Sequence, residues 1–314
     1  MQDIYLITGA TGFVGSNIVR KLILKKKNVH ILTREKKLNW RLLDIASKIT
    51  IHKIDLLSSN LQSVINDIKP TYIFHLAAYG SLPKEENIKE LIDINFLGTV
   101  NLINALKQNK FKLFINTGSS SEYGIKAIPM VETDLPFPIN DYGITKLAAT
   151  LYVSKEAVKN NLPLITFRLF SVYGKYEEKT RLIPSVILAA IENKPIEVGN
   201  PVYVRDFVYI DDVVDAYFQA CKVKVLPGEI FNIGCGVQHS IGEVVDTIRK
   251  ITKSSSIVKW DGVKKQSRQV EPKMWQADVS KARKKLNWVS GHTLEKGLLS
   301  TIQDLKKYYV KNET

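Results

Sequence analysis

The sequence is short of cysteine and has no long apolar run and no basic leader. Only Cys221 and Cys235 occur among its 314 residues, too few for a disulfide framework or a zinc site. No apolar run approaches the roughly 18 residues of a membrane span. The amino terminus runs straight into a strand-like segment without a basic region or cleavage site, which argues against a secretion signal. We therefore expect a cytoplasmic location, no membrane association and no metal.

Acidic residues are scarce relative to basic ones, since 45 Lys and Arg against 31 Asp and Glu give a net charge of +14. A nucleic-acid-binding protein would gather this charge in a stripe with interleaved aromatic residues. Here 36 of the 45 basic residues are Lys, and they are spread along the whole chain. We expect a solvated basic surface and no nucleic-acid partner; an anionic small ligand is the next interpretation.

Strand and helix patterns alternate through the first half of the chain, which predicts an α/β fold with a doubly wound, Rossmann-type parallel sheet. Strands are expected at residues 4–8, 29–32, 49–54, 71–76, 112–117 and 164–169, and helices at 15–25, 61–68, 88–107 and 142–159. The later part is less regular, with strands at 204–209 and 230–233 and helices at 180–193 and 241–252. We expect a dinucleotide-binding domain at 1–167 plus about 205–235, and a smaller C-terminal substrate-binding lobe at 168–204 and 236–314.

A glycine-rich turn connects the first expected strand to the first expected helix. Gly9, Gly12 and Gly15 stand at a three-residue spacing. The first permits a tight turn, the second lets the backbone approach a pyrophosphate, and the third lets the helix pack against the strand. The helix N-terminus adds amide donors and partial positive charge. The turn therefore predicts a dinucleotide site that includes Thr11, Phe13 and Val14; a packed turn without a ligand is the plainer alternative.

The residues after the second expected strand select the cofactor. NAD-binding proteins place Asp or Glu there for the ribose 2′-hydroxyl, whereas an arginine suits a 2′-phosphate. This chain has Arg34 followed by Glu35. We favour NADP on this basis and keep NAD as the alternative.

Tyr142 and Lys146 form the chain's one Tyr-x-x-x-Lys pair, and their spacing places them on one helix face. Hydride transfer at a carbinol carbon needs a proton moved at the oxygen, and a tyrosine hydroxyl is a weak base at neutral pH. A neighbouring ammonium favours the phenolate, so we expect Lys146 to lower the pKa of Tyr142. A helix start with a solvated lysine is the plainer alternative.

The chain resembles the extended short-chain dehydrogenase/reductase family that acts on nucleotide sugars. The resemblance covers nearly the whole chain, and the Gly-x-x-Gly-x-x-Gly spacing is the form that this family uses. The matching segments are residues 8–15 (TGATGFVG), 75–78 (HLAA), 94–99 (INFLGT), 119–124 (SSSEYG), 142–146 (YGITK), 167–174 (FRLFSVYG), 204–212 (VRDFVYIDD), 231–234 (FNIG) and 277–288.

This resemblance implies roles for individual residues. Ser119 takes the place of the catalytic hydroxyl, and Asn95 would brace the catalytic helix through a water. The residues implied to line the cofactor are Asp55, at the adenine or as a helix N-cap, with Leu56, Leu76, Ala77 and Ala78. The residues implied to contact the substrate are Ser119, Ser120, Ser121, Tyr142, Ser171 and two arginines at the sugar-nucleotide pyrophosphate, Arg205 and Arg268. Alone, each arginine would be read as a surface residue.

Departures from the family pattern bear on the reaction. The 4,6-dehydratases carry an Asp-Glu pair where this chain has Ser120 and Ser121, so we expect no elimination of water. Glu122 comes one residue later and would point the other way on an extended segment. Ser171 replaces a family asparagine in a segment that touches the substrate in relatives, so the sequence does not specify the identity of the sugar.

Three functions remain. We favour NADPH-dependent reduction of a nucleotide-linked 4-keto-6-deoxy sugar because of Arg34. The alternative is an NAD-dependent nucleotide-sugar 4-epimerase, and a redox-inactive NADP-binding regulator is the third.

The sequence also predicts a homodimer. Two expected helices, 88–107 and 142–159, carry apolar residues on more than one face, and a second apolar face must be buried. The residues concerned are Leu91, Ile94, Leu102, Ile103, Leu147, Leu151, Val153 and Val158. Relatives pair these helices in a four-helix interface.

Overall fold

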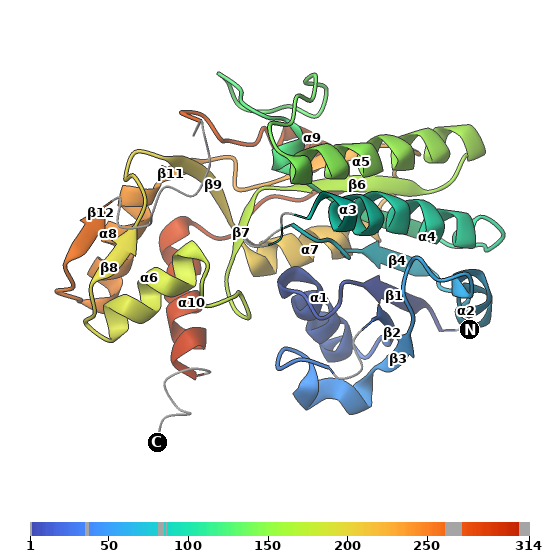
Figure 1. The fold of residues 1–314 in the computed structure, drawn as a ribbon, viewed down its shortest axis with the longest axis horizontal. Coiled ribbons are helices and arrows are strands. Elements are labelled where there is room, and N and C mark those ends of the chain that lie inside the picture. Colours follow the sequence, from blue (N-terminus) through green and yellow to red (C-terminus); the bar gives the residue numbers. More distant parts are fainter. Residues whose placement is uncertain (1, 35–37, 81–84, 86, 261–271, 308–314) are drawn as a thin grey trace.

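A parallel sheet forms the larger part of the molecule in the computed structural model (Figure 1), which describes residues 2–34, 38–80, 85, 87–260 and 272–307. Among these residues seven strands pair in the order β10-β6-β5-β4-β1-β2-β3. Their bounds are β1 Ile4–Thr8, β2 Asn28–Thr33, β3 Thr50–Lys53, β4 Tyr72–His75, β5 Leu113–Ser119, β6 Leu164–Leu169 and β10 Ile230–Ile233. This confirms the expected doubly wound α/β fold.

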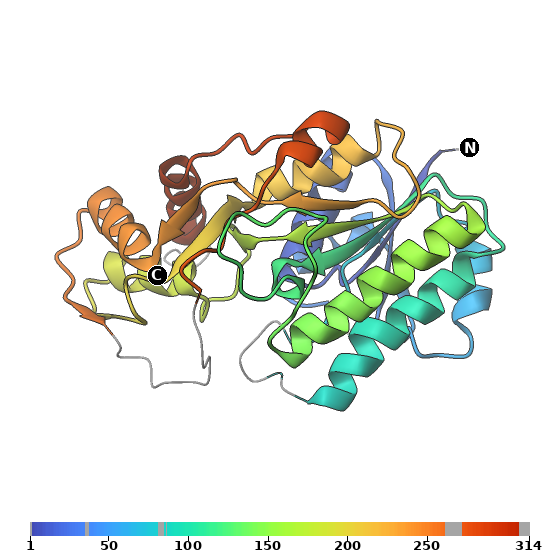
Figure 2. The same ribbon diagram turned by 90° about the horizontal axis from the view of Figure 1, so that it is seen from above.

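Helices cover both faces of this sheet because successive strand residues point to opposite sides. Tyr5 and Ile7 of β1 pack in one apolar core with helices α1 and α7, whereas Leu6 packs in the other with α2, α4 and α5. Figures 1 and 2 show the helices on either side of the strands. The bounds are α1 Phe13–Leu24, α2 Leu61–Ile68, α4 Gly98–Leu106, α5 Asp141–Asn160 and α7 Ile210–Ala220. A short 3-10 helix, η1 Leu43–Lys48, precedes β3.

The helix expected at residues 88–107 is interrupted. It comprises α3 (Ile88–Leu91), a π-helical turn η2 (Ile92–Leu97) and α4. A π turn adds a residue to the helical repeat, and such turns are frequent at functional sites. Apolar spacing alone did not indicate this turn, which contains the buried Asn95.

The smaller lobe contains two small sheets. β9 (Val204–Tyr209) runs antiparallel to β11 (Gln238–Ser240) and parallel to β7 (Ser171–Tyr173), while β8 (Ile196–Val198) pairs with β12 (Val258–Trp260). Its helices are α6 Leu182–Ile191, α8 Ile241–Thr252 and α10 Leu294–Leu305, whereas α9 (Ser280–Leu286) packs on α7 and β10. Figure 2 shows this lobe beside one end of the main sheet. The domain boundaries stay a prediction.

Candidate active site

The glycine turn between β1 and α1 is so tightly packed that side chains at Gly9 and Gly15 would collide with neighbouring backbone atoms. Gly9 has a φ of +67°, which favours glycine. A Cβ added at Gly15 would lie 2.2 Å from the Gly9 carbonyl oxygen, and one at Gly9 would lie 2.5 Å from the Ala77 nitrogen. Gly12 caps α1 without a side chain. The backbone amides of this helix start are therefore open to an anionic group such as a pyrophosphate.

A cavity of about 250 Å³ opens beside this turn, at the carboxyl ends of the strands. It brings together many of the residues expected to hold the cofactor, namely Gly9, Thr11, Gly12, Arg34, Asp55, Leu56, Leu76, Ala77 and Ala78. Its wall also includes residues that the sequence analysis did not name as site residues: Thr8, Leu32, Thr33, Ile54, Leu57, Asp93 and Ile94. Phe13, Val14 and Gly15 belong to α1 beside the cavity rather than to its wall. The cavity and the glycine turn together fit a dinucleotide.

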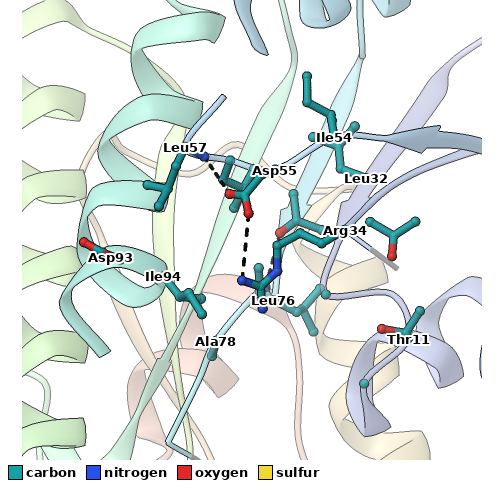
Figure 3. Close-up of a pocket in the computed structure, with 16 residues that line it drawn as sticks. Thr11, Leu32, Arg34, Ile54, Asp55, Leu57, Leu76, Ala78, Asp93 and Ile94 are labelled. Atoms are coloured by element: carbon teal, nitrogen blue, oxygen red, sulfur yellow. Dashed lines mark hydrogen bonds and ion pairs between the residues drawn. The ribbon is translucent and has the colours of Figure 1, made fainter. Parts of the chain in front are cut away.

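Arg34 and Asp55 face each other inside this cavity (Figure 3). The Arg34 Nη1 atom lies 3.8 Å from the Asp55 Oδ2 atom, and the two side chains are 60% and 42% exposed. Asp55 also accepts a hydrogen bond of 2.8 Å from the Leu57 backbone nitrogen. Asp55 thus forms a turn at the end of β3, and does not cap α2, whose N-cap is Asn60.

The strand β5 ends in a tight turn that carries the three serines. Ser119 is the N-cap of a 3-10 turn, η3 (Ser120–Glu122), and its hydroxyl accepts from the Ser121 nitrogen at 3.1 Å. The segment is therefore not extended as expected, because it turns directly after Ser119. The turn folds Glu122 back so that its Oε1 accepts from the Ser119 nitrogen at 2.8 Å and its Oε2 accepts from the Arg168 Nε at 2.8 Å.

Tyr142 and Lys146 lie in the first turns of α5, which begins against that serine turn. Asn140 caps the helix by accepting from the Gly143 nitrogen at 2.7 Å. A Cβ at Gly143 would lie 2.6 Å from the Ser121 carbonyl oxygen, so only glycine allows this close approach. Lys146 is buried, and a side-chain hydrogen bond links Ser119 to Tyr142. The structure therefore brings Ser119, Tyr142 and Lys146 together.

Burial dominates the electrostatics of this pair. It raises the pKa of Tyr142 to about 12, against the opposing effect of the Ser119 hydrogen bond. Burial also lowers the pKa of Lys146 to about 8, against the opposing charge of Glu122. The net shift of the Tyr142 pKa is therefore upward rather than the expected lowering, because the loss of hydration outweighs the Ser119 hydrogen bond and the charge of Arg181.

Asn95 in the π turn braces the catalytic helix directly. Its Nδ2 donates to the Thr145 Oγ1 at 3.0 Å, and its amide also exchanges hydrogen bonds with the backbone of Tyr79. The bracing of the catalytic helix implied by the resemblance is thus seen as a direct contact, and the implied water stays a prediction. Asn95 thus ties η2 to α5 and to the loop after β4.

A buried histidine joins the cofactor turn to the helix layer. The His75 Nδ1 lies 2.6 Å from the Thr8 Oγ1, and its Nε2 lies 2.9 Å from the Thr99 Oγ1. Burial lowers the pKa of His75 to about 3, so the ring is neutral at physiological pH. Thr8 in turn accepts from the Ala77 nitrogen at 3.2 Å, which fixes Ala77 beside Gly9.

Two of the expected substrate residues, Ser120 and Arg205, contact a tryptophan that sequence reasoning missed. The Trp275 Nε1 donates to the Ser120 Oγ at 3.1 Å, and the Arg205 guanidinium carbon lies 5.5 Å from the Trp275 ring centroid. Ser171 lies in β7, paired with Phe207. Arg268 lies outside the described residues. No motif marked Trp275, because it belongs to a segment far along the chain that the fold returns to the serine turn.

Asp206 and Asp211, the acidic residues that follow Arg205 in the same motif, each have defined partners. Asp206 accepts from the backbone nitrogens of Cys235, Gly236 and Ala277. Asp211 forms an ion pair with Lys175 at 2.8 Å. In the described residues no group of three or more metal-ligating side chains comes together, and no described helix is long and apolar enough to cross a membrane.

The sequence model of a family described as "NAD dependent epimerase/dehydratase family" matches residues 5–234. The chain belongs to this family. Its members in the comparison carry out several reactions on nucleotide sugars, so the match establishes an NAD(P)-dependent enzyme that modifies nucleotide sugars. A regulator without enzymatic activity is thereby set aside.

Three relatives illustrate the range of the family. The UDP-glucuronic acid 4-epimerase of Bacillus cereus, solved with UDP-glucuronic acid and NAD, is 28% identical with a TM-score of 0.87 and covers 98% of this chain and 100% of that chain. The UDP-glucose 4-epimerase of Lactobacillus helveticus is 26% identical over 98% of both proteins. The GDP-6-deoxy-D-talose 4-dehydrogenase of Aggregatibacter actinomycetemcomitans is 28% identical over 81% of this chain and 82% of its own length.

Proposed function

We propose that the protein is an NAD-dependent nucleotide-sugar 4-epimerase, in which Ser119, Tyr142 and Lys146 carry the proton transfer. The observation that carries this proposal is the meeting of the serine turn with the start of α5 beside a dinucleotide-shaped cavity. Similar 4-epimerases have been solved with NAD and UDP-glucuronic acid. The proposal reverses the preference for a reductase that the sequence alone suggested.

Each residue has a defined task in this reaction. A nicotinamide cofactor held by the glycine turn and by residues such as Thr11 and Ala77 would supply reversible hydride transfer at the sugar C4. Tyr142 takes the proton from the C4 hydroxyl and later gives it back, while the Ser119 hydroxyl donates a hydrogen bond to the same oxygen. Lys146 supplies positive charge that favours the tyrosinate. Ser120 and Ser121 offer no carboxylate for loss of water, which argues against a dehydratase.

Arg205 supports the substrate class. We place it at the pyrophosphate of the sugar nucleotide, because an arginine contacts phosphate oxygens through two parallel hydrogen bonds. Its guanidinium lies near Trp275, which bonds the serine turn. A pyrophosphate bound at Arg205 would therefore lie close enough to the serine turn for the attached sugar to reach it.

A second candidate is the NADPH-dependent reduction of a nucleotide-linked 4-keto-6-deoxy sugar. The observation favouring it is Arg34, whose guanidinium points into the cofactor cavity where a 2′-phosphate would need a cation (Figure 3). Asp55 opposes this reading, because it pairs with Arg34 and brings a negative charge to the same place.

The purified protein distinguishes the two candidates. An epimerase should retain NAD and interconvert UDP-glucose with UDP-galactose, or UDP-glucuronate with UDP-galacturonate, without added cofactor; the products are separated by ion-pair chromatography. A reductase should be free of cofactor and should oxidise added NADPH in the presence of a 4-keto-6-deoxy sugar nucleotide. Loss of 340 nm absorbance without any epimer would overturn the main proposal.

A further inference from the structure

A completely buried ion pair lies directly behind the serine turn. Glu122 is 0% exposed and Arg168 is 2% exposed. Arg168 stands on β6 opposite Gly118 of β5, and its Nε donates to the Glu122 Oε2 at 2.8 Å. Burying two charges costs hydration free energy, so a pair in this position calls for an explanation beyond stability.

The geometry of the pair is narrowly defined. A Cβ at Gly118 would lie 2.5 Å from the Glu122 Oε1, so the strand must have a glycine where the carboxylate folds back. The second carboxylate oxygen binds Arg168, whose guanidinium carbon lies 4.4 Å from the Tyr123 ring centroid. The Tyr123 hydroxyl donates to the Asn232 Oδ1 at 2.6 Å. Strands β5, β6 and β10 thus hold this one carboxylate in place.

We propose that Glu122 is a positioning residue of the active site: held by Arg168, its carboxylate fixes the backbone of Ser119 and supplies a buried negative charge near Tyr142 and Lys146. The hydrogen bond from the Ser119 nitrogen to Glu122 supports the positioning of the Ser119 backbone. The electrostatic role rests on the proposed catalytic roles of Tyr142 and Lys146.

The charge acts on both groups in the same direction. Glu122 opposes ionisation of Tyr142 and favours the protonated form of Lys146, so it raises the pKa of each. It therefore keeps Lys146 cationic near neutral pH although burial works against that charge. The other groups that act on these two are Ser119, Arg181 and Glu85 around Tyr142, and His75 beside Lys146.

The substitution Glu122→Gln tests the charge while it retains a side-chain oxygen for the Ser119 nitrogen. The full-length protein is labelled with ¹³C at the lysine ε-carbon, and the Lys146 signal is assigned with Lys146→Met. In the wild type we expect Lys146 to titrate near its pKa of about 8. In Glu122→Gln the titration should move to lower pH by about one unit or more, as expected for the loss of a nearby opposite charge.

This titration needs neither substrate nor turnover, so it remains decisive even when the 4-epimerase proposal fails. Glu132→Gln is the matched control: Glu132 bonds the Asn232 nitrogen in the same network but is not among the groups acting on Lys146. It should leave the Lys146 titration unchanged. An equal titration in wild type and Glu122→Gln would overturn the proposed electrostatic role.

Glu122→Gln leaves the Arg168 charge buried without its partner, and this could prevent the single variant from folding. A second variant is designed for that case. Glu122→Gln/Arg168→Gln removes both charges together. Lys146 should again titrate at lower pH than in the wild type, and an unchanged titration in the double variant would equally refute the proposal. With an active substrate, the limb of the kcat profile that reports Tyr142 deprotonation should also move to lower pH in either variant.

Discussion

At the residue scale, the candidate chemistry depends on a few side chains whose environments oppose their ionisation. Tyr142 and Lys146 both lose hydration, which shifts the pKa of each toward its neutral form. A bound nicotinamide ring in its oxidised, cationic form would favour the tyrosinate. Without that charge the Tyr142 hydroxyl stays protonated at neutral pH, because its pKa is about 12.

Tyr142→Phe removes the hydroxyl while retaining the ring. We expect turnover to fall by about 10²–10⁴-fold, the usual contribution of general acid–base catalysis. Retained NAD, measured by absorbance after denaturation, and the melting temperature should stay close to the wild type. A variant with an unchanged kcat would refute the proton-transfer role.

Arg34→Ala separates the two candidate cofactors. If Arg34 binds a 2′-phosphate, the substitution should lower NADPH affinity roughly ten- to hundredfold and leave NADH affinity unchanged. The reason is that hydrogen bonds to charged groups are worth about 1.5–3 kcal/mol. For an NAD enzyme, removal of the cation should free Asp55 for a ribose hydroxyl and leave NADH binding intact or tighter. Both affinities can be measured by fluorescence titration.

At the element scale, most of the sheet could be predicted from the sequence, whereas the turns that make the site could not. The helix expected at 142–159 is observed as Asp141–Asn160, because its apolar residues recur at helical spacing over a long stretch. Helix α7 was missed, since its motif was read only as a family signature. The folding back of Glu122 was missed because it depends on Arg168, a partner 46 residues away in the chain.

Strand β9 carries Arg205, the residue that we place at the sugar-nucleotide pyrophosphate. Arg205→Ala should raise the KM for the sugar nucleotide by roughly tenfold or more, from the loss of about 1.5–3 kcal/mol of charged hydrogen bonding. Affinity for the cofactor should not change. The control is the melting temperature: a marked loss of stability with an unchanged KM would assign Arg205 to support of Trp275 rather than to substrate binding.

At the scale of the whole molecule, one helical face is left apolar and exposed. Leu151 is 55% exposed and Val158 is 70% exposed on α5, and Ile88 and Ile92 are exposed on the neighbouring α3–η2 segment. Four of the apolar residues that the sequence analysis named on these two helices lie in the core: Leu91, Leu102, Ile103 and Val153. Exposed apolar patches on soluble proteins mark interaction sites, which supports a homodimer through these helices.

Leu151→Arg should convert that dimer into a monomer, because a charge buried in an interface without a partner is costly. The mass in solution is measured by light scattering at micromolar concentration. Leu24→Arg is the matched control, since Leu24 is 79% exposed at the end of α1, on the opposite face of the sheet. A wild-type protein that is already monomeric would contradict the prediction.

The position of β10 has a consequence for how the molecule is made. The chain leaves the main sheet at Leu169, builds β7, α6, β8 and β9, and returns only with Ile230–Ile233 to pair with β6. During synthesis the edge of β6 therefore stays unpaired until the ribosome has passed residue 233. Such long-range pairing is slow and leaves a strand edge open to aggregation.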